Sequence, residues 1–153
     1  MSAPKRRRSW VPGSRTSGSD RGMRRQPKCD CLEWMSSILG ALNDTRHLRL
    51  LELLMRQELC VTQLTESLQL HQYEASRILG SLRRAGLLET RRDGKWIHYS
   101  VSKSVQEDAF GRGLLEAIHE RISASGEMSE DFKRLGKYLA LGPKKLGSKP
   151  LAA

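Results

Sequence analysis

Three cysteines are the side chains in this sequence best suited to chemistry. Cys29 and Cys31 form a Cys-x-Cys pair, and Cys60 stands alone in the stretch Glu58-Leu-Cys-Val-Thr-Gln-Leu64. Two thiols separated by one residue suit two ligands of one soft metal ion, because soft ions favour thiolates. Cysteine is also among the most often buried residues, so Cys60 is open to a second interpretation as a small core residue. Three cysteines cannot all pair within one chain, and no disulfide framework is expected.

The positive charge of the chain is concentrated in its first 28 residues. The 153 residues contain 27 Lys and Arg against 17 Asp and Glu, a net charge of +10. Residues 1–28 hold nine basic side chains and one acid, so they carry +8, and the remaining residues carry only +2. This segment is rich in Arg, Ser, Gly and Pro, and we expect it to be disordered. It is interpreted either as a solvated basic tail or as an electrostatic anchor on DNA.

Four segments with helical periodicity precede Gly86. A first helix is expected from residue 32, and Asn43-Asp-Thr45 offers N-cap chemistry for a second. In the second helix Arg49, Glu52 and Arg56 form a narrow polar stripe and leucines cover the rest, so this helix is expected to be central. A third helix is expected over about 61–68 and a fourth over about 72–85, with a turn at 69–70 between them and a C′ glycine at the end.

The fourth helix has two distinct faces at 100° per residue. One face is apolar, and it contains Ala75, Ile78, Leu79 and Leu82. The opposite face contains Tyr73, Ser76, Arg77, Gly80 and Arg84. A helix, a tight turn and a two-faced helix form the helix-turn-helix pattern. The second face must therefore meet solvent or a ligand.

A basic hairpin follows the fourth helix. Residues 87–101 alternate in polarity around Asp93-Gly94, a strong signal for a two-residue hairpin loop, and a hairpin in this position is a wing. A last long helix is expected over about 105–123, and a weaker amphipathic segment over 129–140. The expected fold class is mainly α with a small β-hairpin, a winged helix-turn-helix. The expected domains are a disordered tail at 1–28, the winged-helix domain at 29–125 and an extension at 126–153, partly helical and then disordered.

Five short stretches carry a resemblance to a known family. They are Leu42-Asn-Asp-Thr-Arg46, Glu58-Leu-Cys-Val61, Ser76-Arg77, Ala85-Gly-Leu-Leu88 and Gly94-Lys-Trp-Ile-His-Tyr99. In this order and spacing, the region 32–123 resembles the ArsR/SmtB family of metal-responsive bacterial repressors. The resemblance implies a homodimer that forms through the first and last helices. It also implies that the dimer binds an inverted-repeat operator in double-stranded DNA and releases it when metal binds.

The DNA-binding residues expected from this position in the fold lie on the fourth helix and the wing. They are Gln72, Tyr73, Ser76, Arg77, Gly80, Arg84, Arg91, Arg92 and Lys95. Gln72 and Arg77 can bond base edges, and the wing cations suit phosphates or the minor groove and would make binding salt-dependent. An ordinary solvated face is the alternative. Two residues depart from the family pattern: His71 replaces a hydroxyl cap, and Glu74 replaces a common basic residue and opposes phosphates.

The expected thiol site follows from the arsenic-sensing branch of the family, in which the stretch Glu-Leu-Cys-Val-Cys-Asp-Leu supplies two cysteines. Here Cys60 keeps the first position and Thr62 replaces the second. Arsenite and antimonite require three thiolates, so Cys29 and Cys31 of one subunit are expected to meet Cys60 of the other. As(III) or Sb(III) is the expected inducer, and no permanent cofactor is expected.

Other assignments of the thiols remain open. A tetrahedral zinc or cadmium site would need a fourth ligand such as Asp30, and a Cd-, Pb- or Zn-responsive repressor is one alternative. A disulfide between Cys60 and Cys29 or Cys31 would make a redox switch. The family's zinc site on the last helix is expected to be absent, because its Asp-x-His element reads Asp108-Ala-Phe110. His119 and Glu120 are then expected to be solvated helix residues, and His47 and His98 to be structural or exposed.

Several classes of protein do not fit the sequence. No apolar run approaches the roughly 18 residues of a membrane span, and Lys5-Arg-Arg-Arg8 is not followed by the apolar region of a secretory signal. We therefore expect a cytoplasmic protein with no membrane partner. No nucleophile and base pair, phosphate loop or carboxylate dyad is present, so an enzyme is not expected. A sequence-independent nucleic-acid binder driven by the basic tail is the alternative outside the repressor class.

Overall fold

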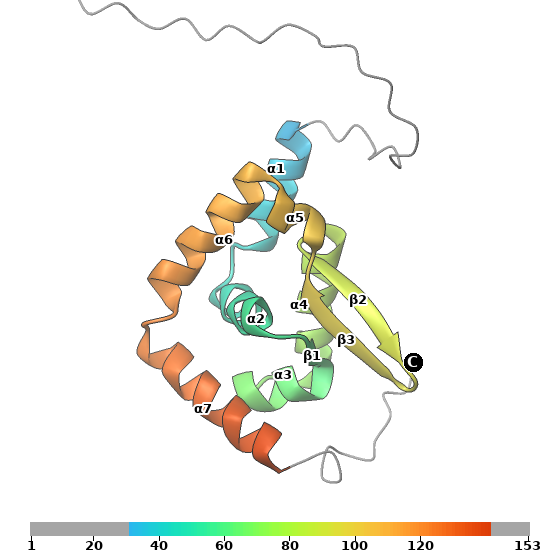
Figure 1. Ribbon diagram of the computed structural model, residues 1–153, viewed down its shortest axis with the longest axis vertical. Helices are drawn as coiled ribbons and strands as arrows, with labels where there is room; N and C mark the ends of the chain where they lie inside the picture. Colours follow the sequence, from blue (N-terminus) through green and yellow to red (C-terminus); the bar gives the residue numbers. More distant parts are fainter. Residues whose placement is uncertain (1–30, 142–153) are drawn as a thin grey trace, which may run out of the picture.

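The computed structural model describes residues 31–141 of the chain (Figure 1). Predictions for the basic tail, for Cys29 and for residues 142–153 lie outside the described residues. The helices are α1 Cys31–Ala41, α2 Thr45–Arg56, α3 Val61–Leu68, α4 Gln72–Arg84, α5 Lys103–Glu107, α6 Ala109–Ile122 and α7 Gly126–Ala140. The strands are β1 Leu59–Cys60, β2 Leu88–Asp93 and β3 Trp96–Val101. The predicted fold class, a mainly helical winged helix-turn-helix, is confirmed.

The core is built around α2, which Figure 1 shows in the middle of the molecule. Leu50, Leu51 and Leu53 of this helix are 0% exposed. Burying a leucine stabilises the fold by roughly 2 kcal/mol relative to exposing it, so this helix contributes much of the core. The helix begins at the predicted cap, because the Asp44 side chain accepts a hydrogen bond from the Arg46 backbone at 2.8 Å.

The helix-turn-helix forms at the predicted positions. Gln69 has φ 54°, a left-handed conformation that ends α3 and turns the chain into α4. At the other end of α4, Gly86 has φ 82°. There the amide of Leu87 donates to Leu82 O and that of Gly86 to Arg83 O, both at 3.0 Å. These two bonds form a Schellman motif, which favours glycine at the left-handed position.

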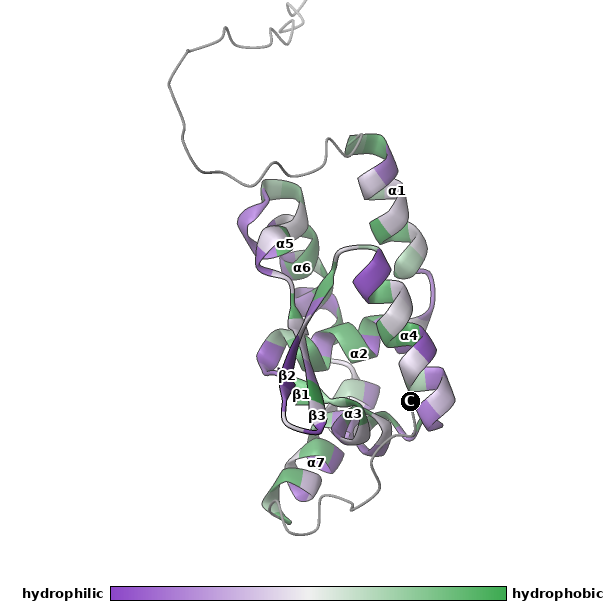
Figure 2. Cartoon of the chain, turned by 90° about the vertical axis from the view of Figure 1, so that its right-hand side faces the viewer, coloured by the Kyte–Doolittle hydropathy of each residue, from purple (hydrophilic) through white to green (hydrophobic). Residues whose placement is uncertain are grey.

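The wing has a third strand that the sequence did not indicate. The two-residue β1 pairs antiparallel with β3, so the sheet order is β1-β3-β2. The hairpin loop lies one residue later than predicted, because Asp93 pairs with Trp96 and the loop is Gly94-Lys95. Gly94 has φ 58°, which explains why the glycine opens the loop. Figure 2 shows that the outer strand β2 is largely hydrophilic.

The last predicted helix is two helices. Asp108 has an extended backbone (φ −74°, ψ 137°) that ends α5, and its side chain accepts from the Gly111 amide at 2.9 Å to cap α6. The apolar stripe of the sequence continues across this break, which is why periodicity alone predicted one element. The prediction over 129–140 is confirmed as the longer helix α7, which packs on α3. No helix among residues 31–141 is long and apolar enough to cross a bilayer.

Two polar residues differ from their predicted surroundings. Glu52, placed in the polar stripe of α2, is 0% exposed. His119 is exposed, as expected, but it has a partner, because its Nδ1 lies 2.8 Å from Glu52 Oε1. Arg56 Nε lies 3.7 Å from the same oxygen. The contact between His119 and Glu52 joins residues far apart in the sequence, so the pattern of α2 alone could not predict it.

Candidate nucleic-acid interface and thiol region

The predicted polar face of α4, named here the α4 stripe, meets solvent, as the sequence predicted. It consists of Tyr73, Ser76, Arg77, Gly80 and Arg84. Tyr73 is 73% exposed, and Ser76, Arg77 and Arg84 are also exposed, while the opposite face of α4 packs into the core. Gln72 is exposed at the first turn. The guanidinium of Arg77 lies 5.8 Å from the centre of the Tyr73 ring, a cation–π distance that limits where both side chains can point.

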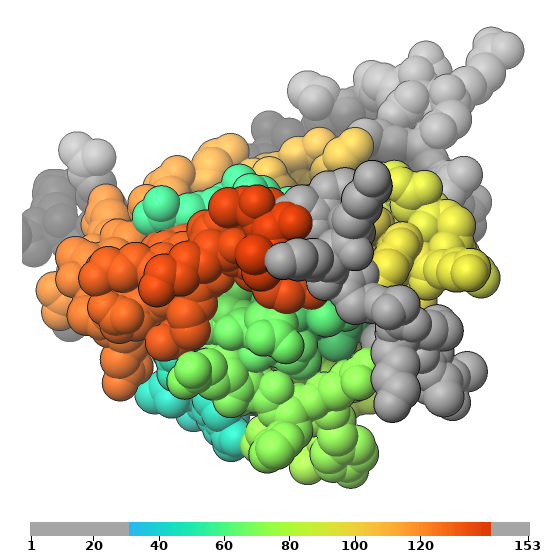
Figure 3. All heavy atoms as spheres, turned by 90° about the horizontal axis from the view of Figure 1, so that it is seen from below, coloured from blue at the N-terminus to red at the C-terminus, as the bar shows by residue number. Residues whose placement is uncertain are grey.

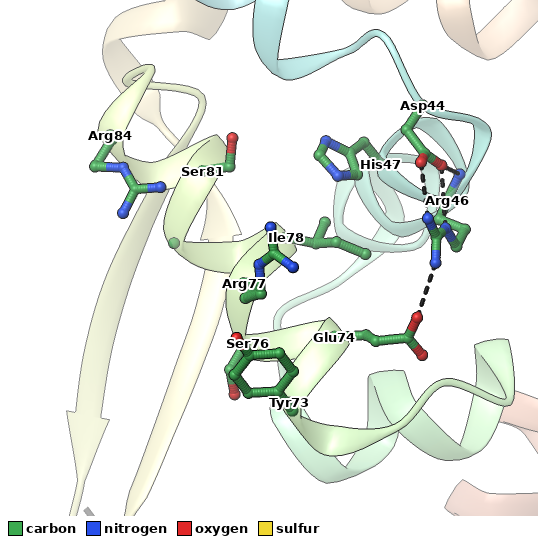
Figure 4. A pocket seen from close by; sticks show the side chains of 11 residues that line it. Asp44, Arg46, His47, Tyr73, Glu74, Ser76, Arg77, Ile78, Ser81 and Arg84 are labelled. Atoms are coloured by element: carbon green, nitrogen blue, oxygen red, sulfur yellow. Dashed lines mark hydrogen bonds and ion pairs between the residues drawn. The ribbon is translucent and has the colours of Figure 1, made fainter.

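An open hollow lies between the start of α2 and the exposed side of α4 (Figure 4). Its lining is mostly polar and consists of Asp44, Arg46, His47, Tyr73, Glu74, Ser76, Arg77, Ile78, Gly80, Ser81 and Arg84. A methyl group built at Gly80 would meet only Arg84 Nη1, at 3.8 Å. The fold itself therefore has room for a side chain at Gly80, and the space above this residue is open.

Arg46 links the two helices that border this hollow. Its Nη2 lies 2.9 Å from Asp44 Oδ2, and its Nη1 lies 2.8 Å from Glu74 Oε1 (Figure 4). The hydrogen bonds from Arg46 lower the pKa of Asp44 to about 2. Glu74 is therefore paired, and the arginine offsets the charge that was expected to oppose phosphates. In the sequence, Arg46 stands out only as part of a family motif, although a basic residue next to a helix cap can indicate such pairing.

The basic side chains of the wing are partly engaged by the protein itself. Arg91 Nη2 lies 2.7 Å from Glu58 Oε1, and this contact raises the pKa of the arginine. Asp93 lies 3.7 Å from Nη1 of the same arginine. Arg92 donates to Gly94 O at 3.2 Å, and Lys95 is exposed in the loop. Of the three predicted wing cations, Arg91 is thus the one with two acidic neighbours.

The predicted thiol ligands do not meet within one described chain. Cys31 is exposed at the start of α1, whereas Cys60 is 5% exposed at the N terminus of α3. Figure 1 shows these two helices at opposite ends of the molecule. Within residues 31–141, no three His, Cys, Asp or Glu side chains are grouped closely enough to hold a metal ion. A three-thiolate site would therefore need a second subunit and Cys29, which lies outside the described residues.

The surroundings of Cys60 come from three parts of the chain. Its amide donates to Gln63 Oε1 at 2.8 Å, which fixes the first turn of α3. His98 of β3 is its cross-strand partner, and the His98 Nδ1 lies 3.6 Å from Glu58 Oε1. The half-buried His98 is consistent with a structural role in the sheet. Burial raises the pKa of the Tyr138 phenol on α7, and the Cys60 thiol adds a smaller effect in the same direction.

Comparison with known proteins defines the family. The arsenic resistance transcriptional regulator ArsR1 of Pseudomonas putida is 40% identical over 89 residues, which cover 56% of this chain and 70% of the relative. The chain belongs to the ArsR/SmtB family. Its family and fold are those of DNA-binding transcriptional regulators. The arsenical resistance operon repressor of Escherichia coli K12 is 46% identical over 48 residues, 31% of this chain and 41% of the repressor.

Other comparisons agree on the winged-helix part of this ArsR/SmtB member. A model of the MarR family matches residues 42–95, from the end of α1 to the loop of the wing. The solved structure of reduced HlyU from Vibrio cholerae has a TM-score of 0.52 and 28% identity, over 60% of this chain and 92% of HlyU. The MarR match does not include α1, β3 or the helices α5, α6 and α7.

Proposed function

We propose that this protein is a homodimeric repressor that binds an inverted-repeat operator and releases it when As(III) or Sb(III) binds cysteine thiolates. The observation that carries the DNA-binding half is the exposed α4 stripe on the second helix of a helix-turn-helix. In a dimer, two such helices would enter successive major grooves of the operator. The relatives named for arsenical resistance support the choice of inducer.

The charges along α4 indicate how it would dock. Glu74 and Asp44 flank Arg46 near the start of the helix, whereas Arg77 and Arg84 lie further along it. Arg77, held beside Tyr73, has the paired donors that read guanine, and Arg84 suits a phosphate. We therefore infer that phosphate contacts concentrate toward the C-terminal half of α4, with Gln72 and Ser76 near the bases and Lys95 and Arg92 on the backbone.

The dimer would form through the layer made by α1 and α6. Trp34 of α1 and Phe110 of α6 make an edge-to-face contact with ring centres 5.8 Å apart, which joins the two helices. Leu39 of α1 is 52% exposed. A second copy packed on this layer would cover that leucine. It would also bring the N-terminal cysteines of one subunit toward the other subunit.

Metalloid binding would act on the DNA-binding pair through its first helix. Cys60 precedes α3 directly, and α3 is the helix that supports α4. If Cys29 and Cys31 of the partner close on Cys60, the N terminus of α3 is held in the geometry of the closed site. A coupling of about 1–3 kcal/mol, roughly 5–150-fold in affinity, is enough for derepression.

The interface is tested by fluorescence anisotropy on DNA from the protein's own promoter. Arg77→Ala is expected to weaken binding by about 1–3 kcal/mol, since it removes a contact that reads a base. Arg83→Ala is the matched control. Arg83 belongs to the same helix but lies outside the α4 stripe, so this substitution is expected to weaken binding much less. Equal losses in the two variants would contradict this docking.

The inducer is tested by adding arsenite to the same complex under reducing conditions. The wild type is expected to release DNA at about one arsenite per subunit, because one ion uses all three thiols. Cys29→Ser, Cys31→Ser and Cys60→Ser are each expected to bind DNA and to stay bound in arsenite. Unchanged release in all three variants would exclude the site. Release by peroxide or cadmium, but not by arsenite, would assign the redox switch or the cadmium-responsive alternative.

A further inference from the structure

The helix α7 covers the side of the molecule where Cys60 lies. Figure 3 shows α7 lying across α3 on this face. Met128 and Leu135 are 0% and 5% exposed, so α7 is packed into the core from its first turn to Leu135, and Tyr138 after it is half-buried. The Arg134 Nε donates to Ser67 O at 2.7 Å, at the last turn of α3, and the remaining turns of α7 run toward the start of α3, which Cys60 precedes (Figure 1). The two helices therefore run in opposite directions, and the end of α7 reaches the start of α3.

A buried ion network holds α7 in this position. Asp131 is 0% exposed, and its two oxygens accept from Arg49 of α2 at 2.7 and 2.6 Å. Arg134 also bonds Asp131, so one carboxylate lies between two guanidinium groups. The hydrogen bonds that Arg49 donates to Asp131 raise the pKa of Arg49. Because Arg134 bonds both Asp131 and Ser67, this single network ties α7 to α2 and to α3.

We propose that α7 is a lid over the Cys60 thiol and that Asp131 is the latch that keeps this lid closed. With the lid closed, Cys60 is 5% exposed, and neither a metalloid ion nor thiolates from another segment can reach the sulfur freely. The end of α7 that carries Tyr138 must move before Cys60 becomes a ligand. This inference deepens the proposed function, on which its metalloid part rests, because it concerns how the inducer reaches its site.

The strength of the Asp131 latch sets how sensitive the protein is to the metalloid. A ligand that binds only the open form has an apparent affinity reduced by the fraction of molecules that are open. Stronger pairing at Asp131 therefore raises the metalloid concentration needed for release, and weaker pairing lowers it. The metalloid concentration needed for release can therefore change without any change in the rest of the winged helix.

Thiol reactivity tests the lid without any metalloid. The full chain carrying Cys29→Ser and Cys31→Ser has Cys60 as its one thiol, and alkylation by iodoacetamide is followed by mass. We expect Cys60 to react at least about tenfold more slowly in the folded protein than in urea, because reaction requires local opening. Asp131→Asn and Tyr138→Ala are each expected to raise the folded rate at least about tenfold. Two outcomes would overturn the lid. One is an equal alkylation rate for the folded protein and for the protein in urea, and the other is no faster alkylation in either Asp131→Asn or Tyr138→Ala.

Two controls separate local opening from unfolding. Glu130→Gln removes the same charge from the residue before Asp131. Glu130 is exposed and pairs with Lys133 at 2.9 Å, so this substitution is expected to leave the alkylation rate unchanged. Rates are compared only for variants that keep wild-type circular dichroism and DNA binding. If Asp131→Asn does not fold, Tyr138→Ala, which leaves the latch intact, decides the outcome.

A final comparison separates this inference from the proposed function. Asp131→Asn in the chain with all three cysteines is expected to release DNA at a lower arsenite concentration than the wild type. Faster alkylation with no release by arsenite in any variant would support the lid and overturn the metalloid function. Normal release by arsenite with no effect of either variant on alkylation would overturn the lid and leave the metalloid function supported.

Discussion

Two arginines of α2, Arg46 and Arg49, each tie this central helix to a different neighbour by an ion pair. Arg46 reaches Glu74 of α4 at the surface, where the two side chains are 46% and 37% exposed. Arg49 reaches Asp131 of α7, and this carboxylate is 0% exposed. The two networks use the same chemistry, but solvent screens the first and not the second. The surface network therefore holds α4 weakly, while the buried network holds α7 firmly.

This difference matches what the proposed DNA docking and the proposed lid require of the two helices. A recognition helix exchanges solvent for DNA, and a pair that water and salt can replace does not oppose that exchange. A helix that covers a thiol needs a higher cost of opening, which a buried carboxylate between two arginines supplies. The comparison thus predicts large effects of substitutions at Asp131 and small effects at Glu74.

The largest effect is expected for Asp131→Asn. Removing the charge leaves Arg49 and Arg134 facing each other without an anion, and we expect a loss of about 3 kcal/mol in the free energy of unfolding. Urea unfolding followed by circular dichroism measures this loss. Glu130→Gln, which breaks only a surface pair, is expected to change stability by under about 0.5 kcal/mol. Similar losses in the two variants would show that burial of Asp131 does not set its contribution.

An intermediate effect is expected at the cap of α2. Asp44→Ala should lower stability by about 1 kcal/mol at pH 7, and Asp44→Asn by less, because asparagine still caps the helix. The pKa of Asp44 is lowered to about 2, so its charged form stabilises the folded state above about pH 4. That contribution is lost as pH falls through about 2. Thermal melts at pH 7 and at pH 2 should therefore show the difference between wild type and Asp44→Asn shrinking in acid.

The smallest effect is expected for Glu74→Gln. Both partners of this pair are exposed, so we expect stability to change by under about 0.5 kcal/mol, with even less change at 1 M salt. The same substitution removes a negative charge near the proposed DNA surface and is expected to raise DNA affinity modestly at low salt. Anisotropy at two salt concentrations measures this gain. A large loss of stability on Glu74→Gln would break the distinction between the two networks.

Local signals in the sequence were sufficient for most of the helix-turn-helix. Helix α3 was predicted at its observed bounds, and Gly86 and the two faces of α4 placed the α4 stripe correctly. Strand β1 was missed because two residues are too short to show alternation. The break at Asp108 was missed because the apolar stripe continues through it.

Contacts distant in the sequence were the part that could not be predicted. The side chains of Glu52 and His119, and those of Arg49 and Asp131, meet only because α2 is surrounded by α6 and α7. The sequence likewise identified the thiols but not that the C-terminal helix α7 packs on α3, the helix that Cys60 precedes. Pairing of Arg46 with Glu74 depends on how α2 and α4 approach each other, which neither helix encodes alone.

Gly80 separates the requirements of folding from those of recognition. Its neighbourhood leaves room for a methyl group, and alanine in a helix interior is favoured over glycine by about 1 kcal/mol. The free protein is therefore less stable than it would be with alanine at this position, although its packing does not require glycine there. Under the proposed docking, glycine lets the backbone of α4 approach a groove of the DNA closely, and this contact compensates for the lost stability. Selection for stability alone would favour a side chain at this position, so the glycine is a trade-off between stability and function at a single atom.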